Sequence, residues 1–253
     1  MRYRLRALGP VALVLCLWQL AMMTGTSPTG HSASPVQVVM AFAELCGTGM
    51  PPGYRLHWHV LYSLWRVSAG VLLAVALGGA LGLALGASRR LHATLMPLVD
   101  FVRPIPPLAW IPVAIVWFGI GFGSAAFLIF LGAFFPVLLG TCSGVLGVDS
   151  GLVEAVRAMG GGRSDIWLKV LLPGAMPSIL TGVRLGMGIG WMTLVAAEFT
   201  GVRQGYGLGY MIMSARDLQR FDMVVAGMAA IGFTGLSMEW TLGRVYRRLL
   251  RWQ

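Results

Sequence analysis

The segment that decides the fold is Pro104–Val148, PIPPLAWIPVAIVWFGIGFGSAAFLIFLGAFFPVLLGTCSGVLGV, which contains no charged residue. Its 45 residues are too many for one helix across a bilayer, because a single span takes ~20 apolar residues. Gly119–Ser124 divides the segment, so we expect two spans, the first beginning near Leu108. Prolines lack a backbone donor and restrict their neighbours, and Arg103–Pro107 therefore cannot form regular helix throughout.

The composition points to a membrane protein as well. Hydrophobic residues make up 57% of the 253 residues, charged residues make up 11%, and the mean hydropathy is +0.77. A soluble domain carries about 25% charged residues. We therefore predict an all-α membrane protein with about six transmembrane helices.

Apolar segments on both sides of the central one complete the six spans. In the second span, the spacing of Gly78, Gly82 and Gly86 is typical of helices that pack closely in lipid. The first apolar segment follows Arg2, Arg4 and Arg6 like the apolar region of a secretory signal. No convincing small-x-small cleavage site follows it, and we expect an uncleaved span. The segments outside the centre are Ala7–Met23, Val67–Ala87, about Pro177–Ala197 and about Met223–Met238.

The first two spans are joined by a segment rich in Pro, Gly, Ser and His, Thr24–His59, which we expect outside the membrane. A short helix is predicted over Val36–Leu45, with Ser34 as its cap and Pro35 in its first turn. The expected division of the chain is residues 1–60, with the first span and this loop, and residues 61–253, a core of five spans.

The distribution of charge indicates the orientation. With six spans and both termini in the cytoplasm, 14 of the 19 Lys and Arg residues fall on the cytoplasmic side, as the positive-inside rule requires. The net charge of +10 is explained by this topology, and we expect lipid but no nucleic acid as a partner.

A polar segment at about residues 149–176 interrupts the apolar ones. Leu152, Val156 and Met159 follow a helical spacing, so a helix is predicted over Ser150–Met159, ended by the three glycines after it. A second helix is expected from a cap at Ser164 and is expected to stop at Pro173. From the pattern alone this helical pair either docks a partner or simply connects two spans.

The sequence of that segment resembles a known motif. Glu154-Ala155-Val156-Arg157-Ala158-Met159-Gly160, followed by Val170-Leu171-Leu172-Pro173, is similar to the E-A-A loop of permease subunits in ABC-type importers. The chain resembles in particular the aliphatic sulfonate, taurine and nitrate permeases, from about Leu61 to the C-terminus. It departs from their pattern at Val156, Gly161, Gly162 and Val170. Further matching stretches are Arg103–Pro112, Trp117–Gly121, Leu131–Pro136, Leu180–Gly186, Val195–Glu198, Gly207–Tyr210 and Ala215-Arg216.

The resemblance implies a type I ABC importer permease fold with a cytoplasmic coupling helix, in the bacterial inner membrane. It further implies two cytoplasmic ATPase subunits, an external solute-binding protein and a second permease copy, as a homodimer. The sequence has no phosphate-binding Gly-x-x-x-x-Gly-Lys-Ser/Thr loop. ATP and Mg are therefore expected on the ATPase, and no catalytic residue, cofactor or metal is expected on this chain. The residues expected to dock the ATPase are Glu154, Ala155, Arg157, Gly160, Leu172 and Pro173.

The resemblance implies a small organic anion as the substrate, an alkanesulfonate or taurine. Nitrate, bicarbonate and a pyrimidine vitamin precursor stay open, because in this family specificity resides largely in the binding protein. The candidate pathway or gate residues are Asp100, Arg103, Arg184 and Glu198.

Two of these residues have open alternatives. Glu198 ends an apolar segment, where an acid is costly and often functional. Three positions of the Glu198 carboxylate stay open. It faces a water-filled path, it pairs with Arg184 or Arg203, or it lies at the outer lipid headgroups. Arg184 is 14 residues earlier, about 21 Å along a helix, so the two cannot pair within one straight helix. Asp100 and Arg103 either join the docking surface or a gate, or anchor a helix end.

Two other classes of function compete with an importer. A membrane-embedded enzyme would need paired ionisable groups at bilayer depth, and apart from Glu198 and Arg184 the apolar segments offer almost none. A passive channel would need no docking loop. The three cysteines, Cys16, Cys46 and Cys142, show no metal-ligand spacing.

Overall fold

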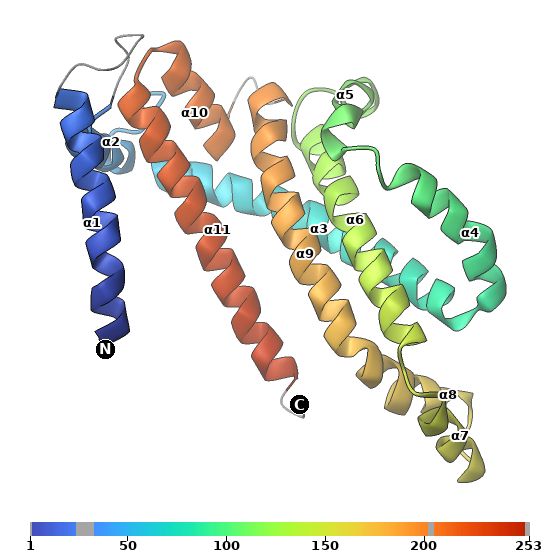
Figure 1. The fold of residues 1–253 in the computed structure, drawn as a ribbon. Helices are drawn as coiled ribbons and strands as arrows, with labels where there is room; N and C mark the ends of the chain where they lie inside the picture. The colour runs from blue at the N-terminus through green and yellow to red at the C-terminus, as the bar shows by residue number, and fades with distance from the viewer. Residues whose placement is uncertain (1, 24–32, 202–204, 251–253) are drawn as a thin grey trace. The chain divides into compact units, whose positions relative to one another are not determined.

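The computed structural model describes residues 2–23, 33–201 and 205–250, and every regular element in these ranges is a helix (Figure 1). This confirms the all-α prediction. The chain forms two compact units, and one boundary between them falls between Tyr62 and Ser63. A later segment joins the N-terminal part in the first unit. The first unit comprises Met1–Tyr62 and Gln204–Thr234, and the second comprises Ser63–Arg203 and Gly235–Gln253.

Among the described residues, four long helices are apolar enough to cross a membrane, and a bent pair of shorter helices makes a fifth candidate span. The N-terminal helix α1 (Arg2–Met23) forms where the first span was expected, but it is not among these candidates. The four long helices are α3 (Leu56–Ala87), α6 (Phe122–Leu146), α9 (Leu172–Gly201) and α11 (Phe221–Leu249).

The bent pair replaces the simple third span expected from Leu108. It consists of α4 (Arg89–Val102) followed by the 3₁₀ turn η1 (Pro107–Trp110) and α5 (Ile111–Phe118), with a bend of 82° between the two halves. The break falls in the proline-rich stretch that was predicted to resist helix. α5 ends at Phe118, and Gly119 follows with φ of 71°, a conformation that favours glycine. α6 begins at Phe122.

Two further helix boundaries differ from the expectation. α3 begins at Leu56, well before Val67, so Arg66 lies inside the helix. α11 continues to Leu249, past Met238, so Glu239 also lies inside a helix. Both differences arise because the spans were bounded by the nearest charge, whereas a helix tolerates a charge that has a partner.

Close approach of small residues joins the helices of the second unit. α6 and α9 lie side by side (Figure 1), and a Cβ on Gly140 would stand 2.8 Å from the Cα of Gly182. α3 packs against α6 in the same way, since a Cβ on Gly82 would stand 2.6 Å from the carbonyl oxygen of Leu138. This contact confirms that the glycine spacing in α3 serves helix packing.

The α3–α6 contact gives a stability prediction. We expect Gly82→Ala to lower the free energy of unfolding by roughly 1–3 kcal/mol, because the new methyl group forces backbone to move. Gly79→Ala on the same helix is the control, since a Cβ there meets nothing within 4 Å. Thermal melting of the two purified variants in detergent checks the difference, and equal melting temperatures would contradict the packing.

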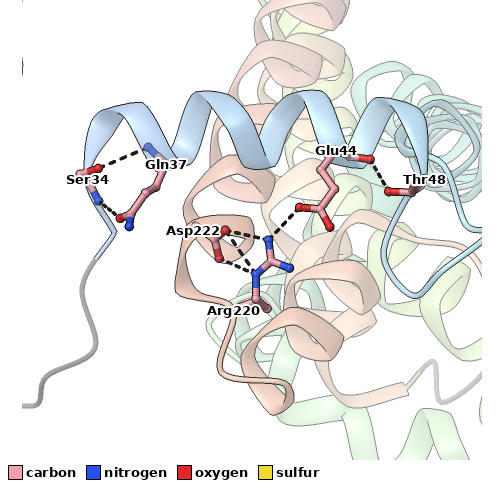
Figure 2. Close-up of polar contacts among 6 residues, drawn as sticks. All are labelled: Ser34, Gln37, Glu44, Thr48, Arg220 and Asp222. Carbon is pink, nitrogen blue, oxygen red and sulfur yellow. Dashed lines mark hydrogen bonds and ion pairs between the residues drawn. The ribbon is translucent and has the colours of Figure 1, made fainter.

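In the first unit, local polar contacts fix a short helix and its neighbour. α2 (Pro35–Gly47) begins as predicted, with Ser34 and Gln37 in a reciprocal capping box (Figure 2). Arg220 donates hydrogen bonds to Asp222 and, at 2.8 Å, to Glu44 of α2. These hydrogen bonds, first that to Asp222, raise the pKa of the Arg220 guanidinium above its ordinary value, so this group stays protonated at physiological pH.

The same unit holds α10 (Leu208–Asp217), which follows the glycine-rich stretch Gly205–Gly207. The ring of His59 is buried, and its Nδ1 lies 2.8 Å from the carbonyl oxygen of Gly207. Tyr206 stacks on Tyr62, with ring centroids 4.9 Å apart. These contacts anchor the glycine-rich stretch to the start of α3. Part of the expected external loop, residues 24–32, lies outside the described residues.

Candidate functional site

The polar segment predicted to couple or connect forms two short helices between α6 and α9 (Figure 1). α7 (Ser150–Ala158) is capped by Asp149, whose Oδ1 accepts a hydrogen bond from the Gly151 amide at 2.8 Å. Gly160 follows with φ of +79°, a conformation that favours glycine. The turn after α7 therefore depends on the glycine of the motif.

The second half of the segment differs from the expectation in two ways. The cap of α8 (Arg163–Asp165) is Gly162, not Ser164, and the Gly162 amide donates to Asp165 Oδ2 at 3.0 Å. The helix also does not stop at Pro173. A π-helical turn η2 (Ile166–Leu171) leads directly into α9, and the Leu172 amide donates to the Trp167 carbonyl.

The π turn explains why Pro173 is tolerated. A proline in a continuous α-helix clashes with the carbonyl four residues earlier and removes a hydrogen bond. The wider π turn carries hydrogen bonds from residue i to i−5, which moves that carbonyl away from the proline ring. Pro173 therefore lies in the first turn of α9, where its missing amide hydrogen costs little.

The surface of this segment combines charge with exposed apolar side chains. Glu154, Ala155 and Arg157 are exposed, and Leu172 and Pro173 are half-buried. Met159 is 79% exposed. Lys169 pairs with Asp165 at 2.7 Å and adds a second charged position. Leu152 and Leu168 are also exposed. Apolar groups left open beside charges on a small rigid element are typical of a protein-binding surface.

Glu198, a candidate pathway residue, is held in a buried network between α3 and α9. Its side chain is 1% exposed. Arg66 Nη1 donates to its Oε1 at 2.8 Å, and Ser63 Oγ donates to both carboxylate oxygens at 2.8 and 3.0 Å. The expected pairing with Arg184 or Arg203 is wrong for Arg184, and Arg203 lies outside the described residues.

Arg184 instead forms an ion pair with Glu239 of α11. The Arg184 Nε donates to Glu239 Oε1 at 3.0 Å. Both side chains are more than half exposed. Arg184 lies 12 residues after the start of α9, about 18 Å along the axis of that helix. Nearby, Tyr246 donates to the carbonyl of Pro177 at 3.2 Å and adds a second polar link between the two helices.

The two largest cavities among the described residues lie beside α9. One of about 900 Å³ is bounded by α4, η1, α6 and α9, and Arg103 lines it. Another of about 620 Å³ is bounded by α9 and α11, and the Arg184–Glu239 pair lines it. Asp100 is exposed and lines neither cavity.

The ion-pair partners of Glu198 and Arg184 were not predicted from the sequence. Arg66 and Glu239 were not singled out, although each pairs with a candidate. A usable signal was present, because an ionisable group within an apolar segment needs a partner of opposite charge. Among the described residues no group of three or more His, Cys, Asp or Glu side chains is placed to hold a metal ion.

The sequence is similar to those of several permease proteins of ABC transport systems. The taurine transport system permease protein TauC of Escherichia coli is 36% identical over 97% of this chain and 89% of its own length. A protein of Bacillus subtilis assigned to aliphatic sulfonate transport, SsuC, is 36% identical over 96% of this chain and 85% of its own. The nitrate import permease protein NrtB of Leptolyngbya laminosa is 34% identical over 74% of this chain and 67% of its own.

A solved structure shares the fold. An inward-facing form of the MetNI methionine ABC transporter superposes with a TM-score of 0.60 and 23% identity, over 76% of this chain and 96% of the other. The fold is thus that of a type I ABC importer permease, as expected. Residues 70–251 match the binding-protein-dependent transport system inner membrane component. The chain belongs to that family and is a permease subunit of an ABC importer.

Proposed function

We propose that two copies of this chain form the path for a small organic anion, a sulfonate or taurine, across the inner membrane. An external binding protein delivers the anion, and two cytoplasmic ATPase subunits bind one α7–α8 segment each. The single observation that carries the coupling role is the exposed apolar and charged surface of that segment. Both termini are cytoplasmic in this arrangement, as the distribution of Lys and Arg favours.

The geometry of the segment suits the transmission of force. α7 follows α6 after a short turn, and α8 and η2 continue into α9. α6 and α9 are themselves joined by glycine contacts without intervening side chains, as at Gly140 and Gly182. A displacement of α7 by the ATPase therefore moves two membrane helices as one body. When ATP closes the ATPase pair, the two segments approach, and the permease changes from inward-facing to outward-facing.

The choice of a sulfonate or taurine rests on the relatives. TauC and SsuC carry those substrates in their names and align with nearly the whole chain. The nitrate relative aligns with a smaller share. Nitrate is accordingly the first competing substrate to test beside taurine and alkanesulfonates.

The docking surface can be tested with one exposed side chain. We expect Met159→Asp to reduce the amount of ATPase that copurifies with the permease at least tenfold, because a charge replaces an apolar contact at the centre of the interface. Ser164→Asp is the control, since Ser164 is also exposed on the segment but adds no apolar contact. Unchanged ATPase recovery with folded Met159→Asp permease would overturn the proposed docking.

A further inference from the structure

The larger cavity differs from the smaller one in its charge. Among the described residues that line it, Arg103 and His92 are the ionisable bases, and none is an Asp or Glu. Within the described part of the chain, the Arg103 guanidinium makes neither an ion pair nor a hydrogen bond. In the smaller cavity Arg184 is neutralised by Glu239. Of these two cavities, the larger one therefore carries a cation that has no ion-pair partner among the described residues.

Three of the elements that line the larger cavity meet at Gly132. A Cβ on Gly132 would lie 3.7 Å from Pro107 of η1 and 3.3 Å from Ile189 of α9. It would also lie 2.9 Å from Thr193 Oγ1, so η1, α6 and α9 pack closely here and hold Pro107 and Ile189 on one stretch of the cavity wall. Arg103 lines the same cavity and precedes Pro107 by four residues.

The cavity also offers apolar contacts and a further hydrogen-bond donor. Trp110, Leu131 and Phe135 line it, together with Pro107 and Ile189. The indole N–H of Trp110 has no acceptor among the described residues. A cation and a neutral donor in an otherwise apolar chamber suit an anionic head group attached to an apolar body.

We propose that Arg103 and the Trp110 indole bind the head group of a small organic anion inside the membrane domain, with its apolar body against Leu131, Phe135 and Ile189. The site selects anions with an apolar tail over inorganic anions of the same head group. It deepens the proposed function, on which its transport role rests, by giving this chain its own part in substrate selection. The binding step itself requires neither ATP nor the binding protein.

The charge of the cavity can be measured with a cysteine reporter. Ile189 is 41% exposed and lines the cavity, so Ile189→Cys is made in full-length permease whose Cys16, Cys46 and Cys142 are replaced by Ser. The probes are 2-sulfonatoethyl and 2-(trimethylammonium)ethyl methanethiosulfonate, which differ in charge. We expect the anionic probe to react faster. We further expect Arg103→Gln to lower the ratio of the anionic rate to the cationic rate about tenfold. Loss of the positive charge should slow the anionic probe about threefold and speed the cationic probe about threefold.

Two matched variants keep this result interpretable. Arg90→Gln removes the same charge at the other end of α4, about 20 Å away along the helix and beyond the screening length. It should leave the ratio unchanged. Arg103→Lys should restore most of the ratio. If Arg103→Gln leaves the ratio at its original value, the cavity is not positively charged by Arg103 and the proposal is wrong.

The preference for an apolar tail is tested on the same reporter. We expect millimolar butanesulfonate to slow labelling by the neutral reagent methyl methanethiosulfonate at least threefold, and sulfate to have no effect. The protection should disappear in Arg103→Gln. Equal protection by both anions, or by neither, overturns the proposed site. The assay does not depend on transport, so a failure here leaves the importer function standing, and an inactive transporter leaves this result standing.

Discussion

Replacing Glu198 by Ala is expected to remove most of the folded permease from the membrane. The carboxylate is buried between α3 and α9 and is the ion-pair partner of Arg66. Its loss leaves the Arg66 guanidinium, which is 6% exposed, without that partner in a poorly polarisable interior. Breaking a buried ion pair in this way costs about 3–5 kcal/mol. The yield of monodisperse protein after detergent extraction, together with its melting temperature, measures the effect.

A paired substitution separates this structural role from a role in the pathway. Arg66→Met combined with Glu198→Leu removes both charges and should recover most of the stability, because a well-packed apolar pair often replaces a buried ion pair without loss. We expect the double variant to support transport as well. A double variant that is as stable as the wild type but transports nothing would assign Glu198 to the pathway instead.

Replacing Gly160 by Val is expected to uncouple the transporter. The φ of Gly160 is +79° and a Cβ there meets nothing within 4 Å, so the effect is one of backbone conformation alone. A β-branched residue is a strong outlier at positive φ, at a cost of order 1–3 kcal/mol. The turn after α7 should therefore rearrange and displace the docking surface, and ATP-driven uptake should fall at least tenfold.

Gly162→Val is the matched control for that experiment. Gly162 lies two residues later with φ of −81° and ψ of 179°, a region that Val prefers. A Cβ there lies 3.8 Å from the Asp165 carboxylate, which is ordinary contact. We expect this variant to transport at close to the wild-type rate. If both variants transport equally well, the special conformation of Gly160 has no part in coupling.

The features that could be predicted from the sequence are those set by local chemistry. The Ser34 cap, the break at the proline-rich stretch and the turn at Gly160 each depend on residues within a few positions of one another. Long apolar runs likewise predict membrane helices, because backbone N–H and C=O groups in lipid must form their hydrogen bonds within the helix.

The features that could not be predicted depend on contacts distant in sequence. Arg66 and Glu198 are separated by 132 positions, and their pairing requires α3 to pack beside α9. Glu239 was placed beyond the last span because a charge was taken to end a helix, whereas its pairing with Arg184 allows α11 to continue. Pro173 was expected to stop a helix, and the π turn before it was not considered.

In the proposed function, this chain moves a solute only together with a coupled ATPase. This is tested by the ATPase activity of the permease reconstituted in liposomes with its ATPase and binding protein, with taurine, butanesulfonate or nitrate in turn. We expect hydrolysis to rise several-fold with binding protein and a sulfonate together, accompanied by uptake of that solute. Uptake by the permease alone, without ATPase or ATP, would contradict the proposed function and show a passive channel.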